Sequence, residues 1–167
     1  MCLLHVSASH PTNRCRPMFL FVQECISQFA KTNPEVAIKL YLDAAALADH
    51  LQAEKSDTEE LSGVVLEMMT QAFSVYDVCL ENIQSRRVCV ELMIAALMQV
   101  ETLDTGEFGT FVTRATQNAA KSKKKRDQCH LVSLCAYLFF PSCEGKRVAY
   151  SEPQRAVECL QRALKLA

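Results

Sequence analysis

The sequence contains no tryptophan, only four glycines and five prolines, and no long apolar run. A β-sandwich or barrel needs many tight turns, and glycine and proline are the residues that such turns use. The run richest in apolar residues, 92–98, is far shorter than the roughly 20 residues that cross a bilayer. We therefore expect a helical protein that contacts a membrane only indirectly, through partners.

The charge is close to balanced, with 18 Lys and Arg against 19 Asp and Glu. Nothing in this total draws the whole chain to nucleic acid or anionic lipid. The nine cysteines are an odd number and none is spaced as CxxC, whereas a disulfide scaffold usually has an even count in a loop-rich chain. We expect reduced, mostly buried thiols in a cytosolic protein. The first residues also lack the basic start of a secretory signal.

Motifs of catalysis are missing from the sequence. It has no glycine-rich phosphate loop, no HExxH and no GxSxG. Cys129 and His130 are adjacent, so their side chains point apart and do not converge on one metal ion. We predict no enzyme activity, no cofactor and no bound metal.

Apolar residues recur at spacings of three and four in most of the chain, which is typical of amphipathic helices. Residues 1–16 lack this period and are expected to be an unstructured or divergent lead, with a helical-repeat segment over 17–167. The expected helices begin near residues 18, 34, 58, 86, 105, 127 and 152. The fourth is apolar nearly all round and should be the most buried. The sixth should be capped by Asp127, and its apolar stripe is Leu131, Leu134, Cys135, Leu138 and Phe139.

The expected helices fall into pairs that start near Pro17, Thr58, Thr105 and Glu152. HEAT and armadillo arrays repeat at about 40 to 47 residues, which fits these intervals. A single pair cannot bury its own apolar stripe, so neighbouring pairs must stack. We predict an all-α fold, a HEAT/armadillo-like α-solenoid of stacked antiparallel helix pairs. A globular bundle has similar stripes and remains the alternative.

Basic residues are concentrated at one place in the chain. Residues 121–126 contain four lysines and one arginine, and no acidic residue lies among them before Asp127. The run is consistent with a nuclear signal or phosphate contact, with a solvated turn at a helix end, or with a docking patch for an acidic protein surface. The candidate interaction residues are Lys121, Lys124 and Lys125.

Four segments occur together in a familiar order: NPEVAIKLYLDAAALAD, MMTQAFSVYD, CAYLFF and KRVAYSEPQRAVECLQRALKLA. Over about residues 20–167 the chain resembles the C-terminal solenoid of the large scaffold subunit of retromer, in the vacuolar protein sorting family. That resemblance implies a non-enzymatic HEAT-like solenoid that wraps a metallophosphoesterase-fold subunit. It also implies that two solenoids meet near their C-terminal regions.

The resemblance has a limit at one motif. Residues 38–42, IKLYL, look like the PRLYL-type motif that binds the arrestin-like subunit, but that motif lies near the family's N-terminus. The role is not carried over, and the arrestin-like subunit is not an expected partner of this chain.

The resemblance thus implies a scaffold of a retromer-like complex in endosome-to-Golgi and endosome-to-plasma-membrane transport, located in the cytosol and peripherally on endosomes. Two alternatives remain: a helical-repeat adaptor of another complex, and an RNA-binding helical repeat. The latter predicts basic residues on successive repeats, and the sequence has a single basic cluster, so we expect no nucleic-acid partner.

Overall fold

A computed structural model describes residues 15–54, 61–140 and 150–167. These residues form helices in the order α1 (Cys15–Phe29), α2 (Pro34–Glu54), α3 (Ser62–Cys79), α4 (Ile83–Gln99), α5 (Thr105–Ala120), α6 (Lys125–Cys135), the 3₁₀ turn η2 (Ala136–Phe139) and α7 (Pro153–Leu166). No strand occurs among them.

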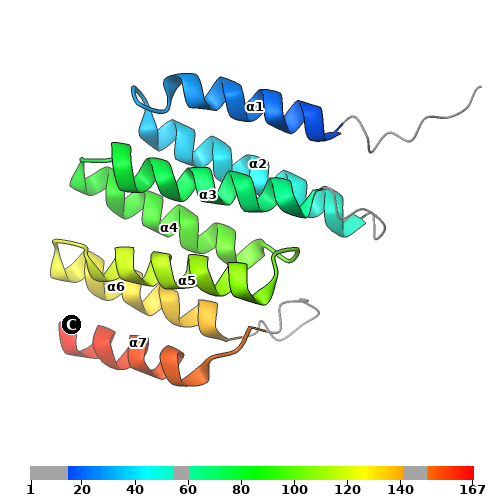
Figure 1. Ribbon diagram of the computed structural model, residues 1–167. Coiled ribbons are helices and arrows are strands. Elements are labelled where there is room, and N and C mark those ends of the chain that lie inside the picture. Colours follow the sequence, from blue (N-terminus) through cyan, green and yellow to red (C-terminus); the bar gives the residue numbers. More distant parts are fainter. Residues whose placement is uncertain (1–14, 55–60, 141–149) are drawn as a thin grey trace, which may run out of the picture.

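The helices run back and forth in antiparallel pairs that stack along one direction (Figure 1). Each helix packs on the next in sequence, and α2, α4 and α6 also contact one another in order. Figure 1 shows α1, α3 and α5 in one layer and α2, α4 and α6 in the layer behind. This two-layer arrangement confirms the predicted all-α solenoid of stacked helix pairs.

Local signals in the sequence mark the starts of three helices. Pro34 begins α2, where its missing N–H costs nothing because the first helical donors have no partner within the helix. The Asn82 side chain caps α4 by accepting from two backbone N–H groups. Asp104 and Glu107 form a reciprocal capping box at the start of α5. The observed pairs begin at Cys15, Ser62, Thr105 and Pro153, close to the predicted positions.

Two expectations about single helices were wrong. The sixth helix begins at Lys125, two residues before Asp127, and has no side-chain cap, so Asp127 lies in its first turn. In α4, Val88 and Met98 are 38% and 44% exposed, and α3 buries more residues than α4. Apolar residues lie on several sides of α4 because this helix packs against several neighbouring helices. They do not mean that the whole helix is buried. The predicted start of the third helix near Thr58 lies outside the described residues and is not tested.

Leu134, which we assigned to the buried stripe of the sixth helix, is only partly buried, whereas the other four members of that stripe are buried. Within α6 the buried residues are Leu131, Val132 and Cys135, so the buried face is turned toward Val132 and Leu134 lies at its edge. The buried face therefore follows Leu131, Cys135, Leu138 and Phe139.

A buried carboxylate joins the first helix pair to the turn before α5. Asp49 is 6% exposed, and its oxygens accept hydrogen bonds from the backbone N–H groups of Glu101 and Thr102 and from the Thr102 hydroxyl. The turn donors would otherwise lack a partner within the helices. This contact fixes the edge of the array opposite to the basic turn.

Candidate protein-interaction surface

The basic run forms the tight turn between α5 and α6. Lys121 is the last residue of the α5 cap, Lys124 precedes α6, and Lys125 is its first residue. The Lys121 N–H still bonds to carbonyls of the last α5 turn, and the Gln128 N–H bonds to the Lys124 carbonyl, at 2.9 Å. The chain therefore reverses within a few residues, which places the three predicted lysines side by side.

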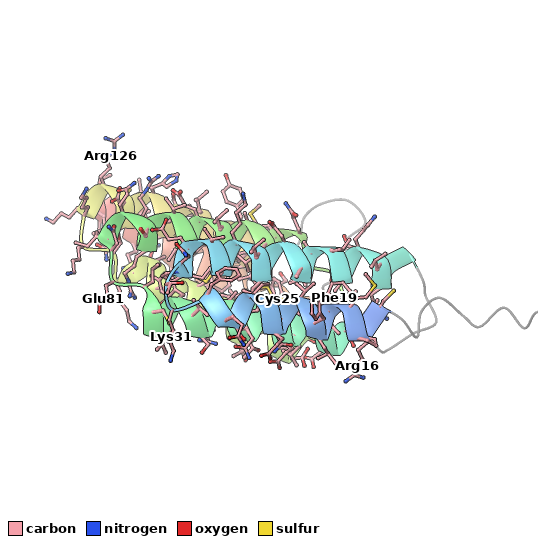
Figure 2. All side chains as sticks on the ribbon, turned by 90° about the horizontal axis from the view of Figure 1, so that it is seen from above. Arg16, Phe19, Cys25, Lys31, Glu81 and Arg126 are labelled. Atoms are coloured by element: carbon pink, nitrogen blue, oxygen red, sulfur yellow. The ribbon has the colours of Figure 1, made fainter. Side chains whose placement is uncertain are left out.

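All three lysine side chains are exposed, as are Lys123 and Arg126. Figure 2 shows Arg126 pointing outward at the end of the array that also carries Lys31 and Glu81, far from Arg16 at the opposite end. This edge is formed by the α1–α2, α3–α4 and α5–α6 turns. The basic turn is thus a projecting corner of the array, open to contact by another protein.

Two acidic residues near the turn, Asp127 and Glu91, already have other partners. Asp127 lies 3.6 Å from the Arg87 guanidinium, and Glu91 bonds to the same guanidinium at 2.7 Å. Glu91 also lies 3.1 Å from Nε2 of His130, whose side chain is half exposed. Within the described ranges no ion pair is formed by Lys121, Lys123, Lys124, Lys125 or Arg126. No described acidic residue therefore compensates their positive charges.

A pocket of about 250 Å³ opens beside the basic turn, between it and the α3–α4 turn. Its lining includes Arg86 and Arg87 from α4, Lys121 and Lys123 from the basic turn, and Asn118 from α5. Sequence analysis selected Lys121 and placed Lys123 in the same basic run, but it missed Arg86, Arg87 and Asn118. The only signal was the Arg86–Arg87 pair, which lies too far from residue 121 in the chain to be linked to it by periodicity.

The cysteines and histidines do not form a metal site in the part of the chain that the structure describes. Of the seven described cysteines, Cys89, Cys135 and Cys159 are buried, Cys25 is exposed, and the other three are partly buried. All seven are free thiols. Burial raises the pKa of Cys89 to about 11 and that of Cys135 to about 12. These two therefore behave as small apolar groups at neutral pH.

Two outer helices leave apolar side chains uncovered. Met18 and Phe21 in α1 are 66% and 70% exposed, and Leu160 and Leu164 in α7 are 47% and 78% exposed. The described helices show none long and apolar enough to pass through a bilayer.

Comparison with protein-family models identifies the family of this chain. A family model described as vacuolar protein sorting-associated protein 35 matches residues 4–167. The chain belongs to this family. The match extends beyond the resemblance seen over residues 20–167, and it includes most of the segment that we set apart as a lead.

Members of the family from distant eukaryotes resemble the chain to a similar degree. It is 29% identical over 157 residues to vacuolar protein sorting-associated protein 35 of Schizosaccharomyces pombe, which covers 92% of this chain and 18% of that protein. It is 30% identical over 151 residues to protein 35A of Arabidopsis thaliana, which covers 90% of this chain and 18% of the relative. Protein 35B of the same plant is 30% identical over 134 residues, covering 80% and 16%. The chain thus spans less than a fifth of the length of these relatives.

Proposed function

We propose that this chain is a scaffold segment of a retromer-like sorting complex, which returns cargo from endosomes to the Golgi and the plasma membrane. The observation that supports this most is the family match over residues 4–167, on a fold of stacked helix pairs. The relatives are named for vacuolar protein sorting. Such an array works by holding other proteins in register along its length, and it needs no catalytic group.

The proposed partner is the metallophosphoesterase-fold subunit of the complex, held along one side of the solenoid. A stacked array suits this role because it presents an extended surface built from successive repeats. We further propose that the arrestin-like subunit does not bind this segment, and that the chain lies in the cytosol, associated peripherally with endosomes through its partners.

A second contact is proposed at the basic turn, between two solenoids of this kind. Lys121, Lys124 and Lys125 project from one corner without ion pairs in the described part of the molecule. Their mutual repulsion is relieved when an acidic protein surface approaches, and the attraction acts over a long range. The proposed occupant is an acidic surface of a second solenoid.

Co-purification from cells tests the scaffold function. A tagged copy of the chain should recover the metallophosphoesterase-fold subunit. A matched variant, Leu138→Asp, should lose that partner because the substitution places a charge at a buried position, 4% exposed in the wild type. Recovery of an unrelated complex would favour the adaptor alternative, and recovery of RNA would favour an RNA-binding repeat. Either result would overturn the proposal.

A further inference from the structure

The pocket between the α3–α4 turn and the basic turn combines positive charge with a buried amide. Asn118 is 6% exposed and lines the pocket. Its backbone carbonyl accepts from Lys121, but its side-chain amide has no hydrogen-bond partner among the residues that the structure describes. A buried polar group without a partner is costly, and such groups usually bond to protein, water or a ligand. This amide is therefore available to a molecule in the pocket.

Arg86 supplies a cation that is already held in position. Its guanidinium donates to the Leu80 carbonyl oxygen at 2.6 Å and lies over the Tyr76 ring, 4.5 Å from the ring centre. Neither contact neutralises its charge, and a guanidinium has five N–H donors, so most of them remain available. Because the group is fixed before any ligand arrives, less side-chain entropy is lost on binding.

The other charged groups on the pocket wall favour an anion. Lys121 and Lys123 approach from the basic turn, and neither forms an ion pair in the described residues. Arg87 also lines the pocket, but Glu91 and Asp127 compensate its charge. Glu81 is the one acidic residue of the lining. Three uncompensated cations against one carboxylate leave the pocket net positive.

The helix ends do not decide the charge that the pocket prefers. Ile83 begins α4 and Lys121 caps the end of α5, so a positive and a negative helix end both lie at the pocket, and the preference for an anion rests on the side chains. A phosphate group carries up to two negative charges and several acceptor oxygens, which matches fixed guanidinium, ammonium and amide donors better than a single carboxylate does.

We infer that this pocket binds a phosphate group, with Arg86, Lys121 and Lys123 as its cationic donors and the Asn118 amide as its buried neutral donor. The volume of about 250 Å³ accommodates one phosphate group and part of its substituent. Two sources share this chemistry: a small soluble phosphate compound and the phosphorylated headgroup of a lipid. The inference does not depend on the proposed sorting function.

Binding of inorganic pyrophosphate to the purified chain, measured by calorimetry, tests the site. Asn118→Ala should weaken binding by about tenfold, because it removes a buried hydrogen-bond donor to a charged ligand. It should leave the unliganded melting temperature unchanged or higher, since the amide makes no hydrogen bond in the described structure. Lys123→Gln should weaken binding by about two- to fivefold, as for an exposed charge pair.

The matched control is Lys39→Gln, which removes the same charge from an exposed position on α2 and should leave affinity unchanged. Soluble inositol trisphosphate, and neutral vesicles with or without a phosphoinositide, separate the two sources. If inositol trisphosphate binds and Asn118→Ala weakens that binding, the ligand is a soluble phosphate compound. If Asn118→Ala weakens binding to phosphoinositide vesicles alone, the ligand is a lipid headgroup. The inference is overturned if pyrophosphate does not bind, or if Asn118→Ala and Lys123→Gln bind it as the wild type does.

Discussion

The carboxylate of Asp49 in α2 accepts hydrogen bonds from both the N–H and the hydroxyl of Thr102, at 2.9 and 2.6 Å, across 53 residues of sequence. The same carboxylate also accepts from the Glu101 N–H at 3.1 Å. A side chain of the first helix pair thus holds the turn that leads into the third pair.

Asp49→Ala should lower the free energy of unfolding by about 1–3 kcal/mol, because the turn donors lose their acceptor. Asp43→Ala is the matched control, since it removes the same charge from an exposed site on the same helix and should change stability by less than about 0.5 kcal/mol. Urea denaturation measures both. Equal midpoints for the two variants would show that water replaces the Asp49 carboxylate at no cost.

The sequence predicted the broad arrangement well, and the reason is physical. Pro34, Asn82 and the Asp104–Glu107 pair act within a few residues of the helix ends that they mark, so their effect is readable locally. The Asp49–Thr102 contact joins residues that lie 53 positions apart in the chain, so no local sequence pattern predicts it. The Asn118 pocket escaped notice for the same reason, because its cations come from two turns that only stacking brings together.

Leu138→Asp should cost at least about 3 kcal/mol of stability, since an unpaired charge would be buried and apolar packing lost. Leu134→Asp should cost less, because this residue is only partly buried. Tyr137→Asp is the matched control: Tyr137 is adjacent in the chain and 64% exposed. Thermal melting should rank the variants with Leu138→Asp lowest and Tyr137→Asp nearest the wild type. The reverse order would show that the face of η2 is assigned wrongly.

Gly109 is required by the close approach of Tyr150 to α5. A Cβ at this position would lie 3.0 Å from the Tyr150 ring, and that ring is itself packed edge-on against Phe108. Gly109→Ala should therefore destabilise the protein by about 1–2 kcal/mol, despite the better helix propensity of alanine. Gly63→Ala meets no atom within 4 Å and should instead stabilise it by about 0.5 kcal/mol. Denaturation midpoints that move in the same direction would contradict this account.

Thiol reactivity should differ sharply between cysteines. Cys25 is exposed and should react with a maleimide in the native protein, whereas Cys89 and Cys135 should not. Burial holds their pKa values at about 11 and 12, so raising the pH from 7 to 9 still leaves both protonated and protected. Peptide mapping by mass spectrometry gives the labelled sites. Denaturant should make both buried thiols reactive, and labelling of Cys135 before unfolding would contradict its position in the core.

The basic turn provides the last prediction, which concerns contact between two solenoids. Reversing Lys121, Lys124 and Lys125 to Glu should abolish salt-sensitive self-association, because the turn would then repel the acidic surface proposed to bind it. The three side chains are exposed and unpaired in the described structure, so the fold should survive. The metallophosphoesterase-fold subunit should remain bound, since its proposed contact runs along the solenoid and not at this corner.

Sedimentation velocity at low and high salt measures the effect. Wild-type association should weaken as the Debye length falls from about 10 Å at 0.1 M salt to about 3 Å at 1 M. The matched control reverses Lys31, Lys39 and Lys165. These lysines are also exposed, and their reversal changes the net charge by the same amount. If the control dissociates as readily as the turn variant, total charge governs assembly and the corner has no special role. If neither variant dissociates, the lysines form a solvated turn, and the second solenoid binds elsewhere.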